Sequence, residues 1–409
     1  MHTTLHPSLR HSREARDAAE IVGRCVHCGF CLATCPTYQL LGDERDSPRG
    51  RIYLIRELLE GAPASETTKT HLDRCLGCRA CETTCPSGVR YGTLLDVGRG
   101  LVEAQRPRSL RERLLRSALL RIVPSRKLFD ALLQVGQSLR AILPASLRAK
   151  VPRRSVSGDA PATTGRRRVI ALDVCAESAT PATRASLTRV LARCGLAIEQ
   201  APAAGCCGAL AYHMGRHDEG LAAMRRNVDA WWPLVEQGVE AIVVSATGCG
   251  VTVREYGRLL FDDPAYAERA ARIAALVRDP AEIVAAATHA WLAGIGRGRR
   301  IAFHAPCSLQ HGIKRDAWVE TLLREAGYEL VPVADAHLCC GSAGSYSVLQ
   351  PSLATQLRDR KLAALAAGAP SLVATANIGC QLHLGGASAI PVRHWIELID
   401  PDAPAHADA

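Results

Sequence analysis

One cysteine pattern occurs twice near the amino end of this 409-residue chain. Each run has the form C-x2-C-x2-C-x3-C-P, and the two runs place their sulfurs at Cys25, Cys28, Cys31 and Cys35, and at Cys75, Cys78, Cys81 and Cys85. Three thiolates spaced in this way converge on one centre, whereas the fourth, just before the proline, points away. The spacing therefore predicts two neighbouring metal centres, each completed by a cysteine of the other run.

This is the cysteine spacing of bacterial two-cluster ferredoxins, which hold [4Fe–4S] clusters. We predict one cluster on Cys25, Cys28, Cys31 and Cys85, and the other on Cys75, Cys78, Cys81 and Cys35. Zinc is the alternative, but zinc sites typically pair two short Cys/His couples across a spacer. Gly29 and Gly77 allow the backbone to come close, so that amide N–H groups reach the sulfurs.

Composition restricts the compartment and the partners. Seventeen cysteines are an odd number, which disfavours a complete disulfide framework, and the first residues lack the apolar segment of a secretion signal. No run of 18 apolar residues occurs. We therefore expect a cytoplasmic protein whose clustered cysteines bind metal. The net charge is +10, yet no basic and aromatic pattern of a nucleic-acid module is present, so no nucleic-acid partner is predicted.

The spacer between the runs predicts a helical ferredoxin-like domain over residues 11–105. Residues 11–24 and 48–59 read as helices, and the 39 residues between Cys35 and Cys75 are too many for a compact β-hairpin ferredoxin. Arg45, Arg49 and Arg51 are expected near the clusters, with a solvated loop as the alternative.

Residues 106–165 form a basic, leucine-rich helical segment followed by a linker that begins near residue 151. The helical part could lie on the inner face of the membrane as a peripheral contact, pack on its own domain, or contact a neighbouring subunit.

Two further domains, 166–295 and 296–402, are predicted from an internal duplication. In each half a buried strand runs into a cysteine, a paired C-C-G follows, and a second strand leads to a last cysteine. The matching cysteines are offset by 132, 133 and 131 positions, which is too regular for chance. Alternating strands and helices predict parallel sheets with the cysteines at their carboxyl ends. The fold class is therefore α+β multidomain: a helical two-cluster domain and two duplicated α/β cysteine-rich domains.

Each half offers four thiols as a candidate metal site: Cys307, Cys339, Cys340 and Cys380 in the second, and Cys175, Cys206, Cys207 and Cys249 in the first. The alternative is that they are ordinary small buried side chains. The second half is favoured because it also contains histidines, which could be ligands, proton carriers or hydrogen-bonded structural residues: His304, His311, His337 and His383.

The combination of twin ferredoxin runs and two C…CCG…C repeats resembles the cysteine-rich-domain family, which includes subunits of heterodisulfide reductase and anaerobic glycerol-3-phosphate dehydrogenase. Four segments are closer still to glycolate oxidase iron–sulfur subunits, namely residues 42–55, 305–312, 339–344 and 377–383. The chain departs from the fullest repeats of the wider family, because Thr252 and His383 stand where a last cysteine is expected.

The resemblance implies an electron-transfer subunit with two [4Fe–4S] clusters. It implies partners as well: a flavin-binding subunit that carries FAD and oxidises glycolate to glyoxylate, a second related subunit, and a quinone or other acceptor. The chain has no GxxxxGK[ST] motif and no GxGxxG after a strand, so substrate chemistry is expected in the flavoprotein. Alternatives are a lactate or glycerol 3-phosphate dehydrogenase subunit, a disulfide-cleaving catalytic subunit, or a zinc-stabilised scaffold.

Overall fold

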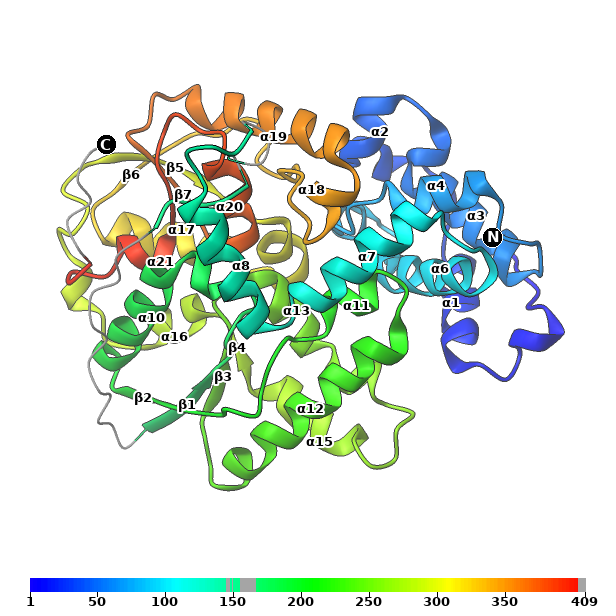
Figure 1. Ribbon diagram of the computed structural model, residues 1–409, viewed down its shortest axis with the longest axis horizontal. Coiled ribbons are helices and arrows are strands. Elements are labelled where there is room, and N and C mark those ends of the chain that lie inside the picture. Colours follow the sequence, from blue (N-terminus) through cyan, green and yellow to red (C-terminus); the bar gives the residue numbers. More distant parts are fainter. Residues whose placement is uncertain (145–147, 149, 155–166, 404–409) are drawn as a thin grey trace.

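The computed structural model describes residues 1–144, 148, 150–154 and 167–403, and it shows a helical amino-terminal part beside two α/β units (Figure 1). The amino-terminal part contains six helices: α1 (Arg13–Gly23), α2 (Pro36–Leu41), α3 (Pro48–Leu59), α4 (Glu66–Asp73), α5 (Ala80–Thr84) and α6 (Tyr91–Gln105). Helices α1 and α3 lie where the sequence predicts them, and for α3 the basis is its apolar spacing.

Serine caps begin three of these helices. Ser12, Ser47 and Ser65 each accept a hydrogen bond from the backbone N–H three residues further on, which satisfies one of the donors left free at a helix start. The buried faces of the helices form one core, whose most enclosed members include Ile21, Ile55, Leu58, Leu72 and Leu94. This core supports the two cysteine runs, which lie in the connections between the helices except for Cys81, which lies in α5.

Two exposed helices, α7 (Leu110–Ile122) and α8 (Arg126–Ser138), form the basic, leucine-rich segment. Ser109 and Glu112 make a reciprocal capping box at the start of α7. Figure 1 shows α7 leaving the amino-terminal part and α8 lying across the outside of the repeats. Residues 155–166 of the predicted linker lie outside the described residues.

The first repeat is built on a parallel sheet of order β2-β1-β3-β4. Its strands are β1 (Arg167–Ala171), β2 (Leu196–Glu199), β3 (Ala241–Val243) and β4 (Val277–Arg278). Its helices are α10 (Pro181–Arg193), α11 (Ala209–His213), α12 (His217–Glu236), α13 (Thr247–Arg254), α14 (Tyr256–Leu259), α15 (Ala267–Leu276) and α16 (Pro280–Ala286).

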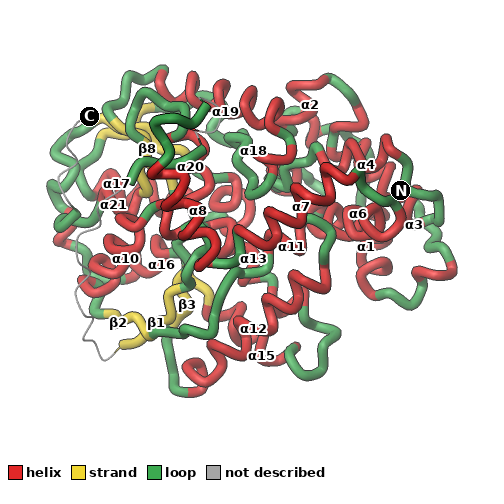
Figure 2. The backbone as a smooth tube through the Cα atoms, in the orientation of Figure 1, coloured by secondary structure: helices red, strands yellow, loops and turns green. Residues whose placement is uncertain are grey.

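The second repeat has the equivalent order, β6-β5-β7-β8, and is also parallel. Its strands are β5 (Arg300–His304), β6 (Glu329–Val331), β7 (Leu372–Thr375) and β8 (Val392–His394). A π-helical turn (Ser308–Ile313) follows β5, and the helices are α17 (Asp316–Glu325), α18 (Tyr346–Leu349), α19 (Pro351–Ala366), α20 (Ile378–Gly385) and α21 (Trp395–Leu398). The duplication and the parallel sheets are thus confirmed, and Figure 2 shows the strands confined to these two units.

The two repeats share one hydrophobic core, which runs from Val169 and Leu187 in the first to Leu322 and Trp395 in the second. A buried ion pair also joins them, because Arg189 lies 2.6 Å from Asp400. Within the described residues no helix is both long and apolar enough to cross a bilayer.

The amino-terminal part contacts both repeats through polar side chains. Arg79 pairs with Glu255 of the first repeat at 2.5 Å. The Tyr346 hydroxyl of the second repeat donates to the Arg74 carbonyl at 3.0 Å, and Thr83 lies 2.9 Å from His311. The second cysteine run is therefore held against both repeats.

Candidate iron–sulfur centres

The first centre is a cavity in the amino-terminal part, and its lining contains the four thiols assigned to the first cluster, Cys25, Cys28, Cys31 and Cys85, together with Cys81. Cys25 follows α1, and Cys85, which belongs to the second run, lies at the end of α5. Cys28 is exposed, whereas Cys25 is buried. The structure therefore brings together the thiols that the interleaved pattern assigns to the first cluster.

The second centre is enclosed more deeply. Burial holds the pKa of the Cys81 thiol well above its ordinary value, and the neighbouring thiols Cys78, Cys75 and Cys35 add to the effect. Cys35 also raises the pKa of Cys78, so the fourth thiol of the first run lies near the thiols of the second run. Buried thiols this close together ionise only when positive charge lies among them, which is what iron supplies. The donor set fits a second cluster.

Both runs fold back through two left-handed residues at the same positions. The angle φ is +56° at His27 and +85° at Gly29, and it is +63° at Gly77 and +61° at Arg79. Each run therefore has a glycine at one of these positions, although not at the same one. A Cβ at Gly29 would also lie 3.0 Å from an Arg49 nitrogen. These turns are what allow three thiols of one short run to face a common point.

Hydrogen-bond donors surround the sulfurs of the second centre. The backbone N–H of Gly77 donates to Cys75 Sγ at 3.4 Å, as the glycine predicts. The Tyr91 hydroxyl donates to the same sulfur at 3.7 Å. Thr37 Oγ1 lies 3.3 Å from Cys35 Sγ. Sequence reasoning missed Tyr91 and Thr37, because nothing in the local pattern distinguishes them from other core residues.

The three predicted arginines differ in their positions. Arg51 is fully buried, and its guanidinium lies 3.9 Å from Cys35 Sγ and 3.1 Å from Asp46 Oδ1. Arg49 lines the cavity of the first centre. Arg45 is exposed and pairs with Asp43. Two of the three therefore lie beside the centres, where their positive charge offsets the negative charge of thiolate ligands.

Asp43, Asp46 and His71 also come together within metal-binding distance. Asp46 is already neutralised, since Arg74 lies 3.1 Å from it in addition to Arg51. This cluster is therefore an ion-pair network that orients Arg51 rather than a further metal site.

Four thiols converge in the first repeat at the carboxyl ends of β1 and β3. Cys175 and Cys206 are hydrogen-bonded to each other, as are Cys206 and Cys207, and Cys207 and Cys249. The Cys175 and Cys207 thiols donate hydrogen bonds to Cys206 and lower its pKa. The four predicted thiols therefore form one hydrogen-bonded chain. This chain favours the thiolate form of Cys206.

The second repeat has a corresponding set. Cys307 Sγ lies 3.8 Å from Cys339 Sγ, Cys339 is hydrogen-bonded to Cys340, and Cys340 to Cys380. Gly208 and Gly341, which follow the paired cysteines, have φ of +85° and +86°, and a Cβ there would lie 2.6 Å and 2.7 Å from backbone oxygens. The tight turn predicted for each C-C-G is therefore present, and no other residue fits it.

Of the four histidines named from the sequence, His304 alone joins the thiols. His311 lies 3.2 Å from the His337 carbonyl, and His383 lies 3.3 Å from the Ala354 carbonyl. His304 is 2% exposed, and a donor atom of its ring lies within 4.8 Å of the Cys340 and Cys380 sulfurs. Burial lowers the pKa of His304 to about 3, with Lys361 and His383 contributing, so its imidazole is neutral.

The second centre lies directly against the second repeat. Leu76 and Cys78 belong to one hydrophobic cluster with Cys339, Tyr346 and Cys307. Burial is the largest cause that raises the pKa of the Cys78 thiol, and Cys307 raises it further. Cys78 in turn contributes to the raised pKa of Cys339. This juxtaposition of a predicted cluster ligand with the thiols of the C-C-G repeat was not predicted.

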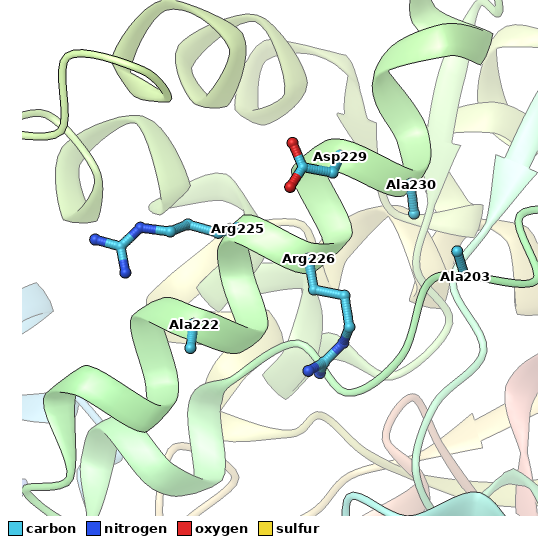
Figure 3. Close-up of a pocket in the computed structure, with 6 residues that line it drawn as sticks. All are labelled: Ala203, Ala222, Arg225, Arg226, Asp229 and Ala230. Atoms are coloured by element: carbon cyan, nitrogen blue, oxygen red, sulfur yellow. The ribbon is translucent and has the colours of Figure 1, made fainter.

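An open depression on the outside of α12 contains no thiol (Figure 3). Two of its charged residues have partners, since Arg225 lies 2.7 Å from Asp263 and Asp229 lies 3.1 Å from Arg269. Arg226 points from α12 toward the loop before Cys206, where its charge favours the thiolate. The depression is therefore not a candidate for a redox centre.

Known proteins match the chain over nearly its whole length. Residues 21–89 match the 4Fe-4S dicluster domain family, and residues 170–254 and 301–385 each match the cysteine-rich domain family. The glycolate oxidase iron–sulfur subunit of Escherichia coli (strain K12) is 50% identical over 98% of each chain. The probable glycolate oxidase iron–sulfur subunit of Bacillus subtilis (strain 168) is 31% identical over 91% of this chain and 90% of its own.

A more distant relative is lactate utilization protein A of Bacillus licheniformis, which is 27% identical over 52% of this chain and 89% of its own length. The dicluster match confirms two [4Fe–4S] clusters as the cofactors, in agreement with the eight amino-terminal cysteines. The extent of the 50% identity, and the order of the dicluster and repeated cysteine-rich domains, show that the chain belongs to the family of glycolate oxidase iron–sulfur subunits.

Proposed function

We propose that this chain is the electron-transfer subunit of a glycolate-oxidising complex. A flavoprotein subunit with FAD oxidises glycolate to glyoxylate, and this chain passes the electrons toward a quinone or another acceptor. A flavin accepts two electrons from the substrate at once, whereas each cluster carries one electron at a time. The clusters therefore let the flavin pass its electrons on singly. The observation that carries the proposal is the pair of interleaved thiol sets, because two centres that exchange ligands must lie close together.

The chain's residues then have distinct roles. Cys25, Cys28, Cys31 and Cys85 hold the first cluster, and Cys75, Cys78, Cys81 and Cys35 hold the second. The donors at Cys75 and the buried Arg51 stabilise negative charge at the second centre. The four-part division of the chain, at 11–105, 106–165, 166–295 and 296–402, agrees with this allocation of roles.

The difference in exposure between the two centres favours the first as the contact with a redox partner. Cys28 is exposed, and the apolar side chains that flank it, Val26 and Phe30, are 67% and 61% exposed. Cys78, by contrast, packs against the second repeat. An apolar rim beside a shallow centre is what a docking flavoprotein would cover.

A second exposed apolar surface supports contact with another subunit. Five residues at helical spacing on and just after α8 are exposed, and together we call them the α8 stripe: Leu128, Leu132, Val135, Leu139 and Ile142. The stripe is exposed to solvent, so packing among the described residues does not account for it. We assign it to the second related subunit of the complex; binding to anionic vesicles instead would indicate peripheral membrane contact.

The test of the relay is Cys28→Ser in the complex purified without oxygen. Glycolate should still reduce the flavin, whereas electron transfer to a quinone analogue should be lost. Cys194→Ser is the matched control, since Cys194 is buried outside both centres and both repeat thiol sets. Loss of flavin reduction as well would mean that the complex had not assembled, and retention of quinone reduction would refute the relay.

The substrate is tested with the same complex. Glycolate, lactate and glycerol 3-phosphate are supplied in turn, and flavin bleaching is followed. The proposal requires glycolate to be preferred; preference for lactate would place the chain with the half-length lactate utilization relatives instead. Reduction of a disulfide by a flavin-free preparation would favour a catalytic role for the repeat thiols.

A further inference from the structure

The two cysteine runs have the same spacing, but the side chains around their sulfurs differ. In the second centre the Arg51 guanidinium lies 3.9 Å from Cys35 Sγ, and the Tyr91 hydroxyl donates to Cys75 Sγ at 3.7 Å. Cys85 occupies in the second run the position that Cys35 occupies in the first. Among the described residues, no side chain donates to Cys85 or to any other sulfur assigned to the first centre. The side-chain donors are therefore concentrated on the second centre.

The charges beside the two centres differ in the same sense. Arg49 lines the cavity of the first centre and pairs with Glu44 at 2.5 Å, so these two charges cancel. Beside the second centre, Asp46 lies 3.1 Å from Arg51 and 3.1 Å from Arg74. A guanidinium group keeps its proton in proteins. Two arginines against one carboxylate therefore leave one positive charge at the second centre.

Arg99 of α6 adds positive charge at the backbone of the second centre. Its guanidinium donates to the Cys75 carbonyl at 2.7 Å and to the Leu72 carbonyl at 3.0 Å, and to no carboxylate of the described residues. Arg51 donates to the neighbouring His71 carbonyl at 2.7 Å. The carbonyls at the end of α4, where the helix dipole is negative, are thus covered by two guanidinium groups.

Burial and positive charge act in opposite directions on the reduction potential of the second centre. Reduction adds one negative charge, so the exclusion of water disfavours the reduced state and lowers the potential. Guanidinium groups and hydrogen bonds to sulfur favour the reduced state and raise the potential. The exclusion of water also strengthens these interactions, because a low dielectric screens charge weakly. Arg51 is 1% exposed and contacts a sulfur of this centre, so we expect its effect to exceed that of burial.

We propose that Arg51 gives the second centre a higher reduction potential than the first, so that electrons move inward from the exposed centre to the enclosed one. In this step one electron leaves the first centre, which is oxidised, and enters the second, which is reduced; no bond forms or breaks. The flavoprotein supplies the electron on the side of Cys28. This inference rests on the proposed function, and it adds the direction of transfer between the two centres.

The test is a redox titration of the full chain, purified without oxygen and followed by electron paramagnetic resonance, with iron and sulfide measured in every variant. The wild type should show two potentials. Arg51→Met should lower the higher one by a factor of about ten in the reduction equilibrium, which is about 59 mV for one electron, and leave the lower one in place. Arg51→Lys, which keeps the charge, should shift it less. Arg45→Met is the matched control, since Arg45 is exposed and pairs with Asp43, and it should move neither potential.

If Arg51→Met does not retain about eight iron and eight sulfide, Arg99→Gln is measured instead and should lower the same potential. A shift of the lower potential alone, an equal shift of both, or no shift would overturn the proposal. In the complex, less than one equivalent of glycolate should reduce chiefly the centre whose signal moves in Arg51→Met; chief reduction of the other centre would overturn the proposed direction. The expected order of potentials without any reduction by glycolate would instead contradict the proposed function alone.

Discussion

Replacing Tyr91 with phenylalanine tests whether the second thiol set holds a redox-active cluster. The Tyr91 hydroxyl donates to Cys75 Sγ at 3.7 Å, and the side chain is 3% exposed. A reduced cluster carries one more negative charge than an oxidised one, so the hydrogen bond is stronger in the reduced state. Removing the donor therefore destabilises the reduced state, and the reduction potential of the second cluster should fall.

The size of this fall follows from the energy of one hydrogen bond. A hydrogen bond to a charged group contributes about 1.5–3 kcal/mol, and a neutral one about 1 kcal/mol. We take the difference between the two redox states as about 1 kcal/mol. For a one-electron couple 59 mV corresponds to a tenfold change, or about 1.36 kcal/mol, so Tyr91→Phe should lower the potential by about 40 mV.

The assay is a redox titration of the purified subunit followed by electron paramagnetic resonance, in which the two clusters are resolved by their potentials. Tyr346→Phe is the matched control, since the Tyr346 hydroxyl donates to the Arg74 carbonyl and not to a sulfur. One cluster should shift and the other should not. An unchanged or raised potential, or an equal shift of both clusters, would refute the assignment of Cys75 and Tyr91 to one centre.

Three further substitutions test one residue beside the second centre, one buried histidine of the second repeat and one residue of the α8 stripe. Arg51→Met should lower the free energy of unfolding by about 3 kcal/mol or more, because it removes a buried charge partner of Asp46; denaturant titration of the cluster absorbance measures this. His394, whose pKa burial lowers from 6.5 to about 4, binds its proton first in the unfolded state, so stability should fall by about 2 kcal/mol between pH 7 and pH 5. A His394→Gln variant should lack this decrease in urea titrations at the two pH values. Leu132→Glu on the α8 stripe should leave the melting temperature unchanged but weaken copurification with the other subunits; unchanged copurification would exclude the stripe as their contact.

Much of the fold could be predicted from local patterns. The bounds of α3, 48–59, follow from Pro48 and the spacing of Ile52, Ile55 and Leu59, and they agree with the structure. The parallel sheets follow from buried strands that run into cysteines. These features are encoded over a few residues, so sequence periodicity suffices. The spacing also predicts the ligand sets, because a C-x2-C-x2-C run leaves little choice of geometry.

What local patterns could not provide is the choice among chemically similar residues. The sequence does not distinguish among the four histidines His304, His311, His337 and His383. Of these four, only His304 lies at the end of a central strand beside two sulfurs. Likewise Arg45 and Arg51 lie in one short segment, but α3 turns Arg51 into the core and leaves Arg45 exposed. Such distinctions depend on tertiary packing, which a single sequence does not display.

The contact between the second centre and the second repeat shows why packing matters for function. Cys78 lies beside Cys339 only because the amino-terminal part is fixed at several points, among them the Arg79–Glu255 pair and the Tyr346 hydroxyl on the Arg74 carbonyl. A ferredoxin-like region joined by a flexible tether would leave both centres open to solvent. Fixed in this way, one centre remains accessible through Cys28 and the other is enclosed against thiols of the repeat. The repeats therefore do more than extend the chain, because they decide from which side an external partner can approach the pair of clusters.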